Sequence, residues 1–176
     1  QMQPIYLGLL HTEEPDDMRN VEKKGEIPAP TQPTYRFLNV AYPCMNEKQL
    51  AIGETTTEGR QELRRNDGVF LIEELERIAL QRCSTAREAV QLMGSLAEEY
   101  GFADNGECLT VADKNEVWHF EIYGNGTLPQ NPSKKSRKPH ADKPGALWVA
   151  VRLPDDHVGI SANIPRIGKV DFEYVE

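Results

Sequence analysis

The sequence predicts an α+β fold in which two helices pack on one face of an antiparallel β-sheet. Apolar residues alternate with a period of two in residues 49–56, recur with a period near 3.6 between residues 70 and 100, and alternate again from residue 107 onward. The first pattern is typical of half-buried strands and the second of amphipathic helices. The order strands, helices, strands favours helices that are segregated to one side of the sheet.

The first 41 residues carry two strand signals separated by a long polar segment. The apolar patch from Ile5 to Leu10 is long enough for one strand, and residues 35–41 predict another. Residues 11–34 are predicted to be an irregular loop, because prolines at positions 15, 28, 30 and 33 block helices and sheet ladders. A metal site is a second interpretation of one group in this loop, although a solvated acidic loop is favoured: His11, Glu13, Glu14, Asp16 and Asp17.

A polar turn, Asn46-Glu47-Lys48, precedes the strand predicted at residues 49–56. Leu50 and Ile52 share one face of this strand, as expected when one face is buried. A glycine inside the strand, Gly53, indicates a close approach by another backbone or by a ligand. Residues 57–68 follow as a polar loop.

Helices are predicted near residues 70–82 and 85–100. The first has an apolar stripe along one side, Leu71, Leu75, Ile78 and Ala79. Its charged residues fall mostly off that stripe: Glu73, Glu74, Glu76 and Arg77. The second begins with a capping box formed by Thr85 and Glu88 and ends at Gly101, a glycine that can adopt positive φ. We expect both stripes to belong to the core.

Four strands follow the helices, near residues 107–112, 116–123, 146–153 and 158–163. The turn Asp113-Lys114-Asn115 joins the first two as a hairpin. Residues 124–145 are predicted to be a second irregular loop. Adjacent carboxylates at Asp155-Asp156 could form an acid–base pair, but on a turn such neighbours usually point apart into solvent.

Length, composition and net charge exclude several classes of protein. The chain has 176 residues, enough for one domain with a substantial core, and we expect residues 1–176 to form a single domain. A net charge of -8 argues against a nucleic-acid surface. The basic run in the second loop (Lys134, Lys135, Arg137, Lys138 and His140) is therefore interpreted as an insertion rather than a phosphate site. No apolar run has the length of a membrane span.

Three cysteines, Cys44, Cys83 and Cys108, are too few for a disulfide framework and form no Cys-x-x-Cys pair. We therefore expect no structural zinc site and no other metal. The sequence also lacks the glycine-rich phosphate loops and the nucleophile elbow that mark common cofactor and hydrolase sites, so no cofactor is expected.

Short motifs spread over residues 27–167 occur together in one order: Asn46-Glu47-Lys48-Gln49-Leu50-Ala51-Ile52-Gly53-Glu54-Thr55-Thr56 with Gly59-Arg60, Leu80-Gln81-Arg82, Thr85-Ala86-Arg87-Glu88-Ala89, Glu99-Tyr100-Gly101, Glu116-Val117-Trp118, residues 148–156, Ala162-Asn163 and Arg166-Ile167. Together they resemble the cysteine-type dipeptidases of the N-terminal nucleophile (Ntn) hydrolase superfamily, which are distantly similar to penicillin V acylase and bile salt hydrolase. The resemblance implies a layered α/β/β/α sandwich of antiparallel sheets.

The same resemblance implies that the nucleophile is a cysteine at the mature N-terminus. This chain begins with Gln1. We therefore expect the nucleophile to lie upstream, the sandwich to be partial, and this chain alone to be inactive. A missing strand would leave an open edge or an apolar surface, which a second copy of the chain could cover.

Five residues match positions that surround the nucleophile in the relatives. Asn163 is expected to position the substrate or to donate to a developing oxyanion. Glu54, Thr55 and Thr56 match the stretch that faces the nucleophile and are expected to bind substrate. Arg166 is a candidate for a supporting ion pair or for a clamp on a substrate carboxylate, or equally a surface arginine. The implied substrate is a dipeptide or another small amide.

Three alternatives remain at the level of sequence. The protein could be an acylase that acts on a non-peptide amide, or a catalytically inactive Ntn-like module with a binding or structural role. Cys44 could be the nucleophile if cleavage after Pro43 exposed its α-amine, which the proline disfavours.

Overall fold

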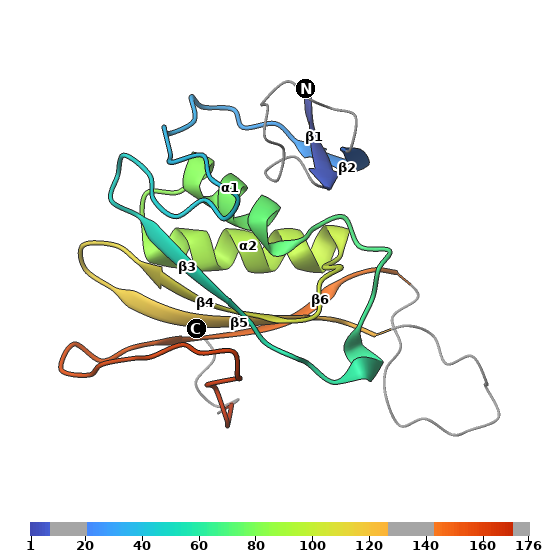
Figure 1. Cartoon of the computed structure of the whole chain (residues 1–176). Helices are drawn as coiled ribbons and strands as arrows, with labels where there is room; N and C mark the ends of the chain where they lie inside the picture. The colour runs from blue at the N-terminus through green and yellow to red at the C-terminus, as the bar shows by residue number, and fades with distance from the viewer. Residues whose placement is uncertain (8–20, 127–142, 171–176) are drawn as a thin grey trace.

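The computed structural model describes residues 1–7, 21–126 and 143–170, and within them it has the predicted α+β architecture (Figure 1). Two antiparallel sheets are present, β1-β2 and β3-β4-β5-β6. The elements are β1 (Met2–Leu7), β2 (Glu22–Pro28), β3 (Ala51–Thr56), the 3-10 turn η2 (Gln61–Leu63), α1 (Ile72–Arg82), α2 (Ala86–Tyr100), β4 (Glu107–Ala112), β5 (Val117–Gly124) and β6 (Ala146–Arg152).

The strand register assigns the side chains of the larger sheet to two faces. Leu109 of β4 lies opposite Phe120 of β5, and these residues point toward the helices. Their neighbours Cys108 and Thr110 lie opposite Glu121 and His119 and therefore point to the other face. At the centre of β4 and β5 the sheet is thus apolar on the helix side and mostly polar on the side away from the helices.

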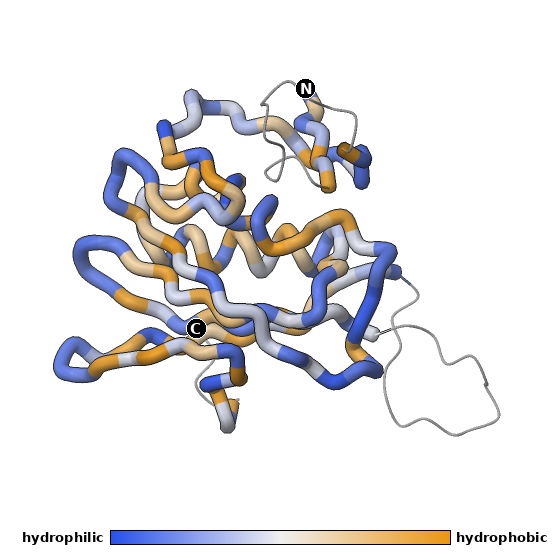
Figure 2. The backbone as a smooth tube through the Cα atoms, viewed as in Figure 1, coloured by the Kyte–Doolittle hydropathy of each residue, from blue (hydrophilic) through white to orange (hydrophobic). Residues whose placement is uncertain are grey.

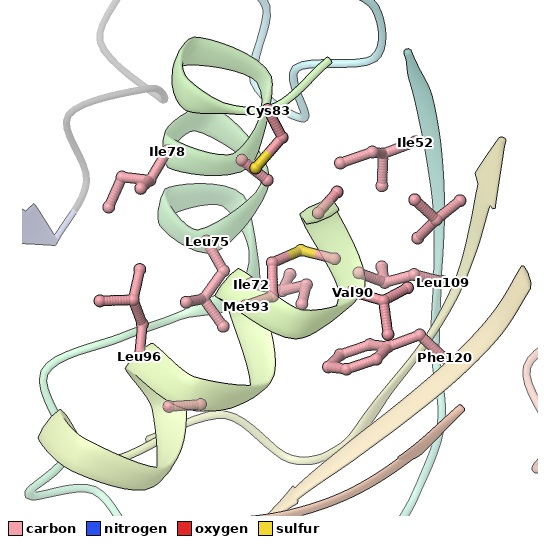
Figure 3. Packing of buried hydrophobic residues seen from close by; sticks show 14 of the residues in the cluster. Ile52, Ile72, Leu75, Ile78, Cys83, Val90, Met93, Leu96, Leu109 and Phe120 are labelled. Carbon is pink, nitrogen blue, oxygen red and sulfur yellow. The ribbon is translucent and has the colours of Figure 1, made fainter. Parts of the chain in front are cut away.

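Both helices lie on the same side of the larger sheet (Figure 1). Helix α2 packs on β4, β5 and β6, whereas α1 packs on α2 and on β1. Figure 3 shows Met93 and Val90 of α2 beside Leu109 and Phe120 of the sheet. Hydrophobic residues follow the helices and the inner strands, and hydrophilic residues follow the connecting loops (Figure 2).

The capping residues predicted at the two ends of α2 make the expected contacts. The Thr85 hydroxyl accepts from the Glu88 backbone nitrogen, and the Glu88 carboxylate accepts from the Thr85 nitrogen. Asp113 of the hairpin turn accepts from the Ala86 nitrogen at 2.7 Å, so the turn also caps the helix from outside. The helix ends at Gly101, whose φ is 90°. These bonds satisfy donors that a helix start otherwise leaves unpaired.

Asn46 explains why the polar turn before β3 has its conformation. Its amide nitrogen donates to the carbonyls of Leu80 and Cys83 at 2.8 and 2.9 Å, at the end of α1. Its side-chain oxygen accepts from the nitrogens of Lys48 and Leu50. The 5% exposed side chain therefore joins the start of the larger sheet to the end of a helix.

Two predicted strands are wrong. In residues 35–41 the structure has only an isolated bridge from Phe37 to Asn46, and in residues 158–163 only a bridge from Ala162 to Ile164. Val158 and Ile160 are 91% and 68% exposed. Alternating apolar residues in these segments meet no neighbouring strand in the part of the chain that the structure describes, and a strand needs such a neighbour to pair its backbone groups.

The predicted loops also need correction. Residues 22–28, inside the loop expected at 11–34, form β2, because β1 offers them an antiparallel partner. The first predicted strand is confirmed as β1, although it begins earlier than expected. Most of the predicted loop at 124–145 lies outside the described residues, as do the acidic group at residues 11–17 and the basic run at residues 134–140.

The charged residues of α1 were expected mostly off the buried stripe, and the structure shows them buried. Glu73, Glu74 and Glu76 are 4%, 2% and 1% exposed, and Arg77 is 8% exposed. Glu74 and Arg77 form an ion pair at 2.6 Å. Helix α1 is enclosed on all sides by α2, β1 and the segments around it, so position off the stripe does not mean exposure here.

No helix among the described residues is long and apolar enough to span a membrane.

Candidate active site

The chain after β6 turns back beneath the larger sheet, on the face opposite the helices (Figure 1). Residues 161–167, which we call the crossing segment, make no strand ladder with this sheet. Side chains from β3, β4 and β5 hold the crossing segment by hydrogen bonds. The position of the crossing segment is therefore determined by particular residues rather than by backbone pairing.

Asn163 lies at the end of β3. Its amide nitrogen donates to the backbone oxygen of Thr56 at 2.9 Å, and the Thr55 hydroxyl donates to the backbone oxygen of Ala162 at 3.3 Å. The Asn163 amide carries two hydrogens, so one remains for a further acceptor. Asn163, Thr55 and Thr56, which the sequence analysis selected from separate motifs, are thus neighbours.

Ser161 is the centre of a polar group two residues before Asn163. Its hydroxyl lies 3.0 Å from the Thr110 hydroxyl, 3.2 Å from Nδ1 of His119 and 3.7 Å from the Cys108 sulfur. Burial and the charge of Arg166 lower the pKa of His119, while Glu121 opposes that shift. The imidazole is therefore neutral at pH 7 and can exchange a hydrogen bond with Ser161 without adding charge.

Glu121 fixes the other end of the crossing segment. Its carboxylate is 2% exposed and accepts from the backbone nitrogens of Arg166 and Ile167, the second at 2.8 Å. The Tyr123 hydroxyl is 3.5 Å from the same carboxylate. These contacts place the exposed Arg166 at the end of the segment that carries Asn163.

Glu54 is connected to the same strand end but points to the helix side of the sheet. Its register neighbour is Leu109, which belongs to the core. The Thr56 hydroxyl donates to the Glu54 carboxylate at 3.0 Å. Thr56 therefore contacts Asn163 through its backbone oxygen and Glu54 through its side chain.

The sequence analysis missed Ser161, His119 and Glu121. The alternation in β5 carried a usable signal, because His119 and Glu121 are polar residues at alternate positions between the apolar residues of the buried face. No sequence signal identified Ser161, because its position depends on where the chain crosses the sheet. The turn carboxylates Asp155 and Asp156 bind Arg152 and His157 separately at 2.7 Å, so they form no acid–base pair.

None of the three cysteines has the surroundings of an activated nucleophile. Cys83 and Cys108 are buried, and burial raises the pKa of Cys83 to about 12 and also raises that of Cys108. Cys44 is exposed in the loop before β3, with no histidine in hydrogen-bond contact among the described residues. No group of three or more metal-ligating side chains with the spacing for an ion occurs in the described part of the chain.

Comparisons with known proteins find one family along most of the chain. The model of peptidase family C69 matches residues 17–176. A probable dipeptidase of Latilactobacillus sakei is 33% identical over 95 residues, which are 54% of this chain and 16% of that protein. A dipeptidase of Bifidobacterium longum is 32% identical over 97 residues, which are 54% of this chain and 14% of that protein.

A probable dipeptidase B of Lactococcus lactis is 31% identical over 102 residues, or 57% of this chain and 17% of that protein. In each case the matched part is less than a fifth of the relative's own length.

Proposed function

The chain belongs to peptidase family C69, and from that premise we propose that it is part of a cysteine-type dipeptidase whose nucleophile lies outside residues 1–176. The activity is hydrolysis of the amide bond in a dipeptide. The family match, the dipeptidase names of the relatives and the surroundings of Cys83 and Cys108 support this proposal. The observation that carries it is the contact of Asn163 with Thr56.

In the proposed reaction the free α-amine of an N-terminal cysteine takes the proton of its own thiol. The thiolate attacks the carbonyl carbon of the dipeptide and forms a tetrahedral intermediate with negative charge on oxygen. The amine of the leaving amino acid takes the proton as the C–N bond breaks, which leaves a thioester. Water then hydrolyses the thioester and restores the thiol.

Asn163 is proposed to stabilise the negatively charged oxygen. The bond to Thr56 uses one amide hydrogen and fixes the side chain, and the second hydrogen is the donor to the oxyanion. Thr55, which contacts the same segment through Ala162, is proposed to line the substrate site. A donor that is fixed before the reaction needs little reorganisation when charge develops.

Arg166 is proposed to bind the carboxylate of the dipeptide. Its guanidinium can form two parallel hydrogen bonds with a carboxylate. The Glu121 carboxylate fixes its backbone nitrogen, which limits where the side chain can reach. An amino-acid carboxylate is present in every dipeptide, so one clamp would serve many substrates.

The arrangement of sheets and helices in the complete protein is also a proposal. We infer that the sheet face opposite the helices is an internal layer of an Ntn-hydrolase-like α/β/β/α sandwich in the complete protein. Leu147 and Val151 of β6 are 51% and 45% exposed there. Ile160, just before the crossing segment, and Ile164, within it, are 68% and 54% exposed. A second sheet packed on this face would bury these side chains.

Hydrolysis assays on the complete protein test the function. We expect release of free amino acids from dipeptides, loss of activity after alkylation of the N-terminal cysteine, and no hydrolysis by residues 1–176 alone. Turnover of N-acyl amides without turnover of dipeptides would establish an acylase instead. A folded complete protein that is inactive on both classes would establish a non-catalytic module.

A further inference from the structure

Ser161 begins the crossing segment and is held to the sheet by two side chains. Its hydroxyl lies 3.0 Å from the Thr110 hydroxyl of β4 and 3.2 Å from Nδ1 of His119 of β5. Thr110 and His119 are direct register partners, so their side chains stand beside each other on the face opposite the helices. The proposed reaction assigns no role to this polar group, although the same segment carries Asn163 two residues later.

The chain just before Ser161 packs against the imidazole ring of His119. A Cβ on Gly159 would lie 2.5 Å from Nε2 of His119 and 2.3 Å from Cδ2 of Leu153, so the Gly159 backbone lies close to the ring. Nδ1 faces Ser161 and Nε2 faces Gly159, which means that one ring contacts the chain at two positions. The ring therefore limits how close the chain can come to the sheet and how far it can slide along it.

The position of Ser161 restricts where the Asn163 amide can lie. Two residues of chain span at most about 7 Å, so a movement of Ser161 is passed on to Asn163. Hydrogen bonds hold each of the three successive residues, because the Ala162 carbonyl accepts from Thr55 at 3.3 Å and the Asn163 amide donates to the Thr56 oxygen at 2.9 Å. A misplacement of about 1 Å in a group that takes part in the chemistry can cost about 10²-fold in rate.

Ser161 and His119 do not form a nucleophile and base of their own. A catalytic histidine is oriented by a third group, usually a carboxylate. Among the described residues no carboxylate is hydrogen-bonded to the His119 ring, and Glu121 on the same face of β5 accepts from the backbone nitrogens of residues 166 and 167 instead. The imidazole is neutral at pH 7, since burial and Arg166 lower its pKa. The pair is thus suited to holding the segment in place.

From these contacts we propose that His119 is a positioning residue for Asn163 and acts through the hydroxyl of Ser161. The inference rests on the proposed function, in which Asn163 donates to the oxyanion. His119 itself touches neither the substrate nor the reacting atoms. It fixes the start of the crossing segment, so that the second amide hydrogen of Asn163 is already aimed when negative charge develops.

Steady-state kinetics of the complete protein with a dipeptide test this role. His119→Leu removes both ring nitrogens, so kcat should fall about tenfold with KM little changed, because the donor is misplaced but still present. His119→Asn should keep kcat within about twofold of the wild type, since its amide can occupy the position of Nδ1 and can donate or accept. His157→Leu is the matched control, because His157 is 63% exposed on the turn after β6, and it should change neither value.

A double-mutant comparison distinguishes positioning from a general effect on the fold. In the Asn163→Ala background His119→Leu should cause no further fall in kcat, because its effect passes through the Asn163 amide. A further tenfold fall in that background overturns the proposal. Equal losses of kcat in His119→Leu and His119→Asn overturn it as well, because the hydrogen bond to Ser161 would then be irrelevant.

Ser161→Ala provides the same test if His119→Leu does not fold, because it removes only a hydroxyl. Its kcat should fall about as much as in His119→Leu, and a parental kcat in folded Ser161→Ala overturns the proposal. The two levels of inference fail in different ways. A wild type that hydrolyses no dipeptide contradicts the proposed function, whereas an active wild type whose kcat is unaffected by both substitutions contradicts only the role of His119.

Discussion

The side-chain amide of Asn163 donates a hydrogen bond to the backbone oxygen of Thr56, 107 positions earlier in the chain, at 2.9 Å. Thr56 ends the edge strand of the larger sheet, and Asn163 lies in a segment that crosses the sheet without pairing to it. This bond brings together two motifs that the sequence analysis selected separately.

Substitution of Asn163 tests its proposed role as an oxyanion donor. In the complete protein, Asn163→Ala should lower kcat and kcat/KM together by about 10²–10³-fold, with KM little changed, because the donor acts on charge that develops in the transition state. Steady-state kinetics with a dipeptide measure this, and circular dichroism verifies the fold. Asn115→Ala, in the exposed hairpin turn, is the control. A change confined to KM would assign Asn163 to ground-state binding instead.

Removal of the Glu121 charge should loosen the crossing segment. In Glu121→Gln the backbone nitrogens of Arg166 and Ile167 no longer donate to a buried carboxylate. We expect their amide hydrogens to exchange at least tenfold faster, while those of β4 and β5 keep their protection. Hydrogen exchange followed by mass spectrometry measures both, with Glu99→Gln as the control. Unchanged exchange would mean that other contacts suffice to hold the segment.

The stability of the chain should fall as pH rises above neutrality. Because the folded pKa of Glu76 is raised to about 9, the folded state holds a proton that the unfolded state has lost above about pH 4.5, so stability decreases until about pH 9. Each such carboxyl contributes at most about 1.4 kcal/mol per pH unit. Urea denaturation at pH 7 and 8.5 should show the decrease, and Glu76→Gln should reduce it.

The pH interval separates this effect from that of His119. The pKa of His119 is lowered, so its contribution changes below pH 7 and not above it. Glu107 has a pKa raised to about 10. In Glu76→Gln, Glu107 should therefore still make stability fall as pH rises, but less steeply than in the wild type. Equal pH dependence in the wild type and in Glu76→Gln would contradict the assignment of a buried, protonated Glu76.

Gly94 should not tolerate a side chain although it lies inside a helix. A Cβ at this position would meet the Trp148 ring at 2.3 Å, and Trp148 is held by a bond from its ring nitrogen to Glu98 at 2.8 Å. Gly94→Ala gains about 1 kcal/mol of helix propensity but should lose more by displacing the indole, for a net destabilisation of about 1–2 kcal/mol. Thermal or urea denaturation measures the net effect.

Gly53→Ala is the matched control for this prediction, because a Cβ there meets no atom within 4 Å. The close approach of another backbone that the sequence predicted at Gly53 is therefore not found among the described residues. Its stability should stay close to that of the wild type. A Gly94→Ala protein that is more stable than the wild type would show that the indole can move without cost.

Local signals explain why part of the fold was predictable. Helix α2 has its capping box, its apolar stripe and its terminal glycine within 17 residues, so its bounds were close to those observed. The hairpin at Asp113 is equally local. The failures involve partners distant in sequence. Residues 22–28 have the sequence of a loop but form a strand because β1 lies beside them. Residues 158–163 have the sequence of a strand, but no strand within residues 1–7, 21–126 and 143–170 lies beside them.

The residues of the candidate site were likewise predictable only in part. Family motifs led to Glu54, Thr55, Thr56, Asn163 and Arg166, and the structure brings the first four to one strand end. Burial of Glu76 could not be predicted, because an apolar stripe predicts that only one side of a helix is buried. Helix α1 is buried on the other sides as well. The Ser161 contacts depend on the path of the crossing segment, which no periodicity encodes.

The attachment of the crossing segment by side chains has a consequence for how such a site can change during evolution. A strand in the middle of a sheet is held by backbone groups that every residue carries, so substitutions rarely move it. The crossing segment depends on the side chains of Thr55, Ser161, Asn163 and Glu121, and each can be altered by a single substitution. The residues next to the proposed substrate site can therefore shift between descendants of one ancestor while the sheet and helices above them stay the same.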